Sequence, residues 1–242
     1  MSERRRADVV LVERGFFDSR AQARAAIEAG GVSVDGAVLR KPSQTIPADA
    51  GIVAQAPHPW VSRGGLKLAA ALDAFGFDVT GAAALDLGAS TGGFTQVLLA
   101  RGAAHVHAVD VGHGQLHPLV AGDPRVTALE GTDARALAGR GIGPFDMLSV
   151  DVSFISLKLV LPAAVPLLKP GAALAALIKP QFEAGRAHLS KGIVRDEAVR
   201  TRVCEDIRAH VAGLGFTVSG LIPSPIEGGD GNREYLIGAR LS

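Results

Sequence analysis

One stretch of the chain, residues 84–95, restricts the possible folds more than any other. It reads ALDLGASTGGFT, in which a short apolar run leads to an acid, Asp86, and then to three glycines. Residues 96–101 are mostly apolar and precede Gly102, a residue type at which helices commonly end. The pattern predicts a strand, a tight turn and a helix, and the glycines give a ligand close access to the backbone of the turn.

A second acid, Asp110, ends the next predicted strand, 106–110, where a carboxylate can accept hydrogen bonds from both ribose hydroxyls of a nucleoside. The glycine loop reads Gly-x-x-x-Gly-Gly, which is neither the dinucleotide pattern Gly-x-Gly-x-x-Gly nor a P-loop ending in Gly-Lys-Ser/Thr. A nucleoside without a phosphate chain therefore fits best, and we predict S-adenosylmethionine as the cofactor.

Asp133 follows the third predicted strand and is placed to accept a hydrogen bond from the adenine amino group. The residues that we expect to bind the cofactor are Asp86, Gly88, Ala89, Ser90, Gly92, Gly93, Phe94, Asp110 and Asp133.

The charge, the cysteine content and the hydrophobic runs of the chain argue against several classes of protein. With 25 basic and 24 acidic residues, the bulk charge gives no argument for nucleic acid, so only local clusters of cations can. The single cysteine, Cys204, rules out a disulfide framework within the chain and fits a reducing cytosol. The apolar run 159–178 is interrupted by prolines, a lysine and a glycine, so it is not a membrane span. We expect a cytoplasmic protein, favoured as a monomer, with no metal and no membrane partner.

Residues 1–55 read as a separate small α+β domain. A helix over 9–14, which Asp8 is placed to cap, precedes a second helix over 20–29 that opens with the capping box Ser19-x-x-Gln22. An Asp-Gly turn between apolar runs then predicts a β-hairpin over 32–39. Residues 56–62 contain two prolines and the only tryptophan, which favours a stiff linker to the domain that fills 63–242.

Cations cluster in this small domain. Arg20 and Arg24 lie four residues apart on one helix face, and Arg40 and Lys41 follow the hairpin. By spacing alone, a solvated face and contact with RNA phosphates are equally favoured. The runs RADVVLVERG, SRAQA and GGVSVDG, in this order, resemble the αL RNA-binding motif of a small-subunit ribosomal protein and of pseudouridine synthases. The residues that we expect to bind RNA are Arg4, Arg6, Arg20, Arg24, Arg40, Lys41 and Arg63.

The larger domain alternates strands and helices. Such alternation predicts an α/β fold with a mostly parallel sheet, helices on both faces, and a ligand at the carboxyl ends of the strands. The seven strands that we expect cover residues 84–87, 106–110, 126–129, 147–150, 172–178, 217–222 and 235–239.

Charged residues stand at several of these strand ends, and each has an ordinary structural interpretation. Asp151 could cap the following helix, Lys67 could be a solvated helix charge and Glu234 a turn charge. Lys179 is harder to explain in this way, because a lysine at the end of a buried strand, beside an acid, can have its pKa tuned for catalysis.

These residues and their surroundings resemble the bacterial TlyA family. The resemblance rests on the glycine loop, Asp151 with SFIS, KPQFE from Lys179, KGIVRD from Lys191, and GNRE ending at Glu234. It implies a Rossmann-like class I, FtsJ-like S-adenosylmethionine-dependent methyltransferase domain joined to the RNA-binding domain. It also implies ribosomal RNA or ribosomal subunits as substrate, with methylation of ribose 2′-hydroxyls, cytidine being favoured.

The resemblance further implies a catalytic tetrad of Lys67, Asp151, Lys179 and Glu234, all of which are present. Two alternatives remain open at this stage. Because the family also has the label hemolysin, one is a membrane-active protein, against which the lack of a predicted span argues. The other is an RNA-binding or ribosome assembly factor that keeps the fold without activity, against which the intact tetrad argues.

Overall fold

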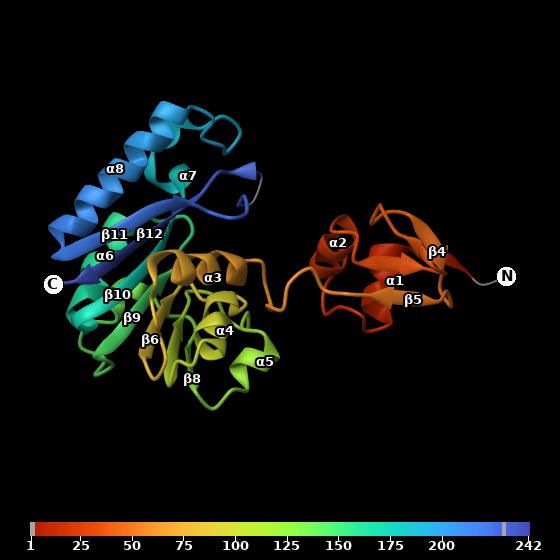
Figure 1. Ribbon diagram of the computed structural model, residues 1–242, viewed down its shortest axis with the longest axis horizontal. Helices are drawn as coiled ribbons and strands as arrows, with labels where there is room; N and C mark the ends of the chain where they lie inside the picture. The colour runs from red at the N-terminus through yellow and green to blue at the C-terminus, as the bar shows by residue number, and fades with distance from the viewer. Residues whose placement is uncertain (1–2, 229–230) are drawn as a thin grey trace. The chain divides into compact units, whose positions relative to one another are not determined.

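The computed structural model describes residues 3–228 and 231–242. It divides into two units, one that runs to Pro59 and one from Trp60 to Ser242 (Figure 1).

The N-terminal unit combines two short helices with small antiparallel sheets. Strands β1 and β4 pair, and β2 lies between β3 and β5. The predicted hairpin is confirmed, because Asp35 and Gly36 both have positive φ, at 49° and 82°, as a two-residue hairpin turn requires. The elements are β1 (Arg4–Arg6), α1 (Ala7–Glu13), α2 (Arg20–Glu28), β2 (Val32–Val34), β3 (Ala37–Val38), β4 (Thr45–Pro47) and β5 (Ile52–Ala54).

The expected capping role of Asp8 is wrong. Helix α1 begins two residues earlier than predicted, after Arg6, and its N-terminus has no side-chain cap. The Asp8 side chain is fully buried and forms ion pairs with Arg6 at 2.9 Å and Arg20 at 2.7 Å. A buried carboxylate needs such partners, and the hydrogen bond from Arg6 is the largest cause that lowers the pKa of Asp8 to about 2. In contrast, Ser19 caps α2 as predicted, accepting a hydrogen bond from the Gln22 amide.

The second unit is built on one seven-stranded sheet, and all seven predicted strands are present. Their order is β11-β12-β10-β9-β6-β7-β8, and β12 runs antiparallel to both of its neighbours. The other pairings in the sheet are parallel. The strands are β6 (Ala83–Leu87), β7 (His105–Val109), β8 (Val126–Leu129), β9 (Phe145–Val150), β10 (Leu168–Ile178), β11 (Phe216–Pro223) and β12 (Tyr235–Leu241).

Helices cover both faces of this sheet, as the alternating pattern predicts (Figure 1). Leu68 of α3 and Leu98 of α4 belong to the core on one face, whereas Leu161 of α6 and Ile207 of α8 belong to the core on the other. The helices of the unit are α3 (Gly64–Phe75), α4 (Gly93–Ala100), α5 (Pro118–Ala121), α6 (Leu157–Ala164), α7 (Pro180–Glu183) and α8 (Glu197–Gly213).

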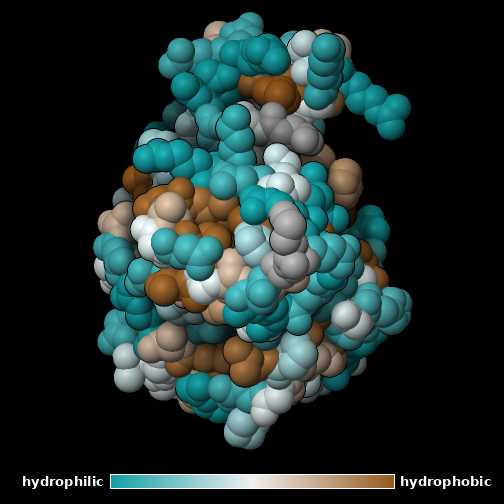
Figure 2. All heavy atoms as spheres, turned by 90° about the vertical axis from the view of Figure 1, so that its right-hand side faces the viewer, coloured by the Kyte–Doolittle hydropathy of each residue, from teal (hydrophilic) through white to brown (hydrophobic). Residues whose placement is uncertain are grey.

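Hydrophobic residues on the face shown in Figure 2 lie in small groups among hydrophilic ones. Within residues 3–228 and 231–242, the structure has no helix with the length and hydrophobicity needed to cross a membrane.

Candidate functional site

The glycine loop after β6 touches the loop after β9. Gly88 has a φ of +82°, and a Cβ atom at this position would come within 2.4 Å of the carbonyl oxygen of Asp151. Only glycine fits such a close approach in this conformation. Gly92, with a φ of +92°, is the N-cap residue of α4 and packs against Leu116 and Val120. The loop therefore depends on its glycines for packing between neighbouring segments as well as for ligand access.

Asp86 lies beneath this loop. Its side chain is fully buried and accepts hydrogen bonds from the hydroxyls of Thr95 at 2.7 Å and Ser149 at 2.8 Å. Burial raises the pKa of Asp86 to about 6, despite these two hydrogen bonds. Although the sequence suggested direct contact with the cofactor, the structure places Asp86 where it ties β6 to α4 and β9 and supports the loop from below.

A pocket of about 440 Å³ opens at the carboxyl ends of β6, β7, β8 and β9. Asp110 lines it, and its two carboxylate oxygens accept hydrogen bonds from the amides of Ser90 and Gly112, both at 2.8 Å. Each oxygen keeps a further lone pair for a ligand hydroxyl. Asp133 lines the same pocket and is paired with Arg135 at 2.5 Å. The hydrogen bond from Arg135 is the largest cause that lowers the pKa of Asp133 to about 2.

A smaller pocket of about 260 Å³ shares Gly88, Ser90 and Asp151 with the larger one. Arg63 and Lys67 also line it, where the first turns of α3 and α4 lie close together. A Cβ atom on Gly93 would come within 3.0 Å of the Gly65 amide nitrogen. The predicted cofactor residues that line one pocket or both are Gly88, Ala89, Ser90, Gly93, Phe94, Asp110 and Asp133.

The four predicted catalytic residues form two ion pairs. Lys67 Nζ lies 2.6 Å from Glu234 Oε2, and Lys179 Nζ lies 2.6 Å from Asp151 Oδ1. Their side chains are 10%, 2%, 11% and 19% exposed in this order. Because Lys67 and Asp151 both line the smaller pocket, the two pairs meet at one cavity.

The structure decides against the ordinary interpretations of these residues. Ser156, not Asp151, caps α6 by accepting a hydrogen bond from the Lys158 amide. Lys67 and Glu234 are buried, so neither is a solvated surface charge. Neither a helix cap nor a solvated surface charge therefore explains why these side chains are buried in two ion pairs.

Sequence reasoning assigned no role to the residues that join the loops after β9 and β10. Glu183 accepts hydrogen bonds from the Ser156 hydroxyl at 2.5 Å and the Leu157 amide at 2.8 Å, and Ser153 accepts one from Lys179 at 2.9 Å. Phe154 packs on Phe182 with ring centroids 5.0 Å apart. The only sequence signal was their presence in the SFIS and KPQFE segments.

Phe154 is unusual in both conformation and exposure. Its side chain is 90% exposed, its φ is +64°, and it lies at the edge of the larger pocket. A bulky residue rarely adopts this backbone region. An exposed aromatic ring held in this way beside a pocket is a candidate surface for stacking.

The predicted RNA-binding cations fall into three groups. Arg6 and Arg20 hold the buried Asp8, and Arg4 donates to the Thr45 carbonyl oxygen. Arg63 lines the smaller pocket of the second unit. The remaining three, Arg24, Arg40 and Lys41, are exposed and form no ion pair within the described part of the chain.

Comparison with known proteins gives matches for both units. Residues 60–241 match the family described as FtsJ-like methyltransferase, and residues 5–52 match the S4 domain. The chain is 44% identical to the 16S/23S rRNA (cytidine-2′-O)-methyltransferase TlyA of Mycobacterium tuberculosis, over 99% of this chain and 91% of that protein. It is 37% identical to Hemolysin A of Brachyspira hyodysenteriae, over 96% of this chain and 98% of that protein.

A solved structure of a hemolysin-named protein from Streptococcus thermophilus is also similar. It is 40% identical and superposes with a TM-score of 0.78, covering 100% of this chain and 90% of that one.

Proposed function

The chain belongs to the TlyA family of FtsJ-like methyltransferases, and from this premise we propose that it transfers a methyl group from S-adenosylmethionine to ribose 2′-hydroxyls of ribosomal RNA, with cytidine as the nucleotide. The main observation in support is the meeting of the Lys67–Glu234 and Lys179–Asp151 ion pairs at a pocket beside the glycine loop. A ribosomal substrate would place this activity in the cytoplasm.

The pockets fit the two ends of the proposed cofactor. In the larger pocket, Asp110 suits the ribose hydroxyls, and Asp133 and Thr132 suit the adenine edge. In the smaller pocket, Arg63 and the N-terminal end of α4 suit the carboxylate of an amino acid. When bound, S-adenosylmethionine supplies a methyl group on a positively charged sulfur.

A ribose hydroxyl is a poor nucleophile while it holds its proton, so the protein must align the oxygen and stabilise the charge that develops on it. We assign this role to Lys179, because its Nζ is fixed by both Asp151 and Ser153. The proton leaves through the Lys179–Asp151 pair, which remains in contact with solvent. Lys67 and Glu234 would position the ribose. The two lysines and two acids together have no net charge, which limits the cost of burying them.

The RNA would be held by both units through different chemistry. In the N-terminal unit, the exposed Arg24, Arg40 and Lys41 suit the phosphate backbone. In the second unit, the exposed ring of Phe154 suits stacking with a base near the target ribose.

The test is transfer of labelled methyl groups to ribosomal subunits and to their extracted RNA. Lys179→Ala, which leaves the 19% exposed Asp151 without its ion-pair partner, is expected to be less stable but folded, and to lose most of the activity, about 100-fold or more. The matched control is Lys158→Ala, because Lys158 is 44% exposed and forms only a 3.9 Å surface pair with Asp206. Wild-type rates in Lys179→Ala would refute its role.

A second measurement tests the proposal as a whole. Calorimetry should show that the wild-type protein binds S-adenosylmethionine, and mapping of the RNA should show the new methyl groups on ribose oxygens. No binding, even with RNA present, would exclude the enzyme. Leakage of liposomes at submicromolar protein would instead support the hemolysin activity for which some relatives are named.

A further inference from the structure

One wall of the larger pocket is held by a carboxylate that does not line the pocket. Glu130, which directly follows β8, accepts hydrogen bonds from three successive backbone amides. They come from Gly114 at 2.9 Å, Gln115 at 2.9 Å and Leu116 at 3.3 Å. These amides lower the pKa of Glu130, the Gly114 amide contributing most. Glu130 therefore fixes a loop that has no regular hydrogen bonding of its own.

This loop, residues 111–117, links the two parts of the proposed donor site. At its start, Val111 lines the larger pocket, and the Gly112 amide donates to Asp110 Oδ1 at 2.8 Å. Further along, Gln115 lines the same pocket and packs on Gly112, where a Cβ atom would come within 2.2 Å of its side-chain nitrogen.

The end of the loop reaches the glycine turn. The His117 amide donates to the Thr91 carbonyl oxygen at 3.1 Å, and a Cβ atom on Gly92 would come within 3.0 Å of Leu116. A shift of this loop would therefore disturb both the hydrogen bond from Gly112 to Asp110 and the contacts of the glycine turn.

We propose that Glu130 is a positioning residue for the methyl donor: it presets loop 111–117 in the arrangement that receives the adenosine group. The inference rests on the proposed function, because it assigns the larger pocket to S-adenosylmethionine. The carboxylate suits the role, because two negatively charged oxygens can accept from three converging N–H groups. A glutamine offers one such oxygen and directs an NH₂ group at the remaining amides.

The expected effect follows from preorganisation. If Glu130→Gln leaves the loop correctly arranged about a tenth of the time, the apparent Kd for the donor rises about tenfold. Donor that has bound restores the arrangement, so kcat at saturating donor should stay close to the wild-type value. Since loop 111–117 has no proposed contact with RNA, the KM for RNA should not change.

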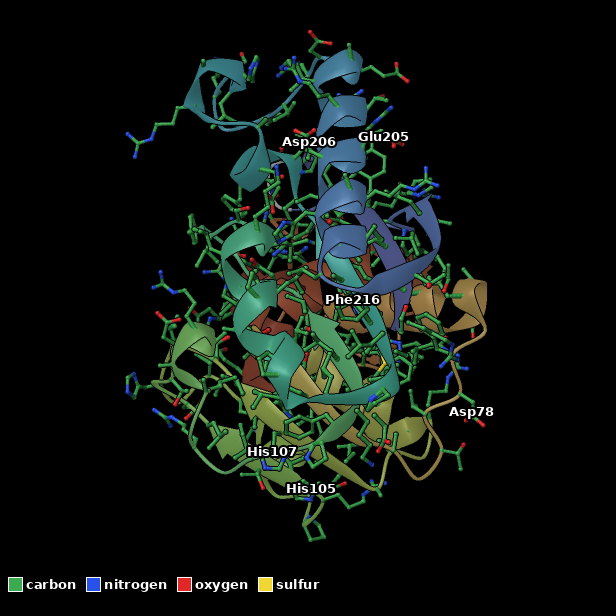
Figure 3. All side chains as sticks on the ribbon, turned by 90° about the vertical axis from the view of Figure 1, so that its left-hand side faces the viewer. Asp78, His105, His107, Glu205, Asp206 and Phe216 are labelled. Atoms are coloured by element: carbon green, nitrogen blue, oxygen red, sulfur yellow. The ribbon has the colours of Figure 1, made fainter. Side chains whose placement is uncertain are left out.

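The experiment compares Glu130→Gln, Glu130→Asp and Glu205→Gln with the wild-type protein. Glu205, on α8 (Figure 3), is 63% exposed and has only a 3.6 Å surface pair with Arg208, so it is a matched control. The measurements are the Kd for S-adenosylmethionine by calorimetry, the KM for donor and for ribosomal subunits, kcat and Tm. Glu130→Asp, which keeps the charge but has a shorter reach, should have an intermediate donor Kd and remains informative if Glu130→Gln folds poorly.

The outcomes separate the inference from the proposed function. A raised donor Kd and KM in the Glu130 variants, with kcat, RNA KM and Tm unchanged, supports the inference. A wild-type donor Kd in Glu130→Gln overturns it, and so does an equal loss in all parameters, which would mean a general effect on folding. Failure of the wild-type protein itself to bind the donor would refute the proposed function.

Discussion

The buried pair of Lys67 and Glu234 allows the stability of the site to be separated from its chemistry. The side chains are 10% and 2% exposed, and their charged atoms lie 2.6 Å apart. Removing one member of such a pair leaves an uncompensated buried charge, which costs about 3–5 kcal/mol. We expect Lys67→Met to lower the free energy of unfolding of the second unit by about this amount and its Tm by roughly 6–20 °C.

The double variant Lys67→Met/Glu234→Leu should behave differently. It removes both charges and fills the space with apolar side chains, a change that is often neutral or stabilising in proteins. We expect its free energy of unfolding to lie within about 1 kcal/mol of the wild-type value, although methyl transfer should be lost in both variants. Stability would then depend on whether a buried charge is left without its partner, whereas activity would depend on the presence of both charged side chains.

The assay is urea unfolding followed by tryptophan fluorescence. Trp60 is the only tryptophan, and its ring packs against Gly65 in the first turn of α3, so it reports on the unit that contains the pair. Lys158→Met, at a lysine that is 44% exposed, should change stability by less than about 1 kcal/mol. The reasoning would be refuted if Lys67→Met lowered the free energy of unfolding by less than about 1 kcal/mol. It would also be refuted if the loss in the double variant equalled the sum of the losses in the two single variants.

Three further predictions concern other parts of the molecule. Because burial raises the pKa of Asp86 from 3.8 to about 6, the folded protein keeps a proton that the unfolded chain loses, and stability falls as the pH rises between these values. Asp86→Asn should remove this decline, up to about 3 kcal/mol, in urea unfolding at pH 4 and 7.5; an unchanged decline would contradict it. Phe154→Ala should lower kcat/KM for RNA about tenfold and leave the Kd for S-adenosylmethionine unchanged, by kinetics and calorimetry. Arg24→Ala should weaken RNA binding and reduce its salt dependence by about one ion without changing Tm, whereas Arg20→Ala should also lower Tm, because Arg20 holds the buried Asp8.

Much of the fold could be predicted because its signals are local. The Asp35-Gly36 turn, the Ser19 cap and the alternation of strands and helices each depend on neighbouring residues, and all three appear in the structure. Asp8 shows where local reasoning fails. An acid before an apolar run has the form of a cap, but its partner Arg20 lies twelve residues away and is brought to it by folding.

The sequence by itself determined the order of the elements, the glycine turn after β6 and the residue types at the strand ends, because these depend on short-range periodicity and backbone conformation. Tertiary structure alone decided which charges become partners. Lys67 and Glu234 are 167 residues apart in the chain and meet only because β12 enters the sheet beside β10, bringing the start of β12 close to α3. The same assembly buried Asp86 below the loop and joined Glu130 to the wall of the pocket, since contacts between distant segments are set by packing and burial, which no local pattern encodes.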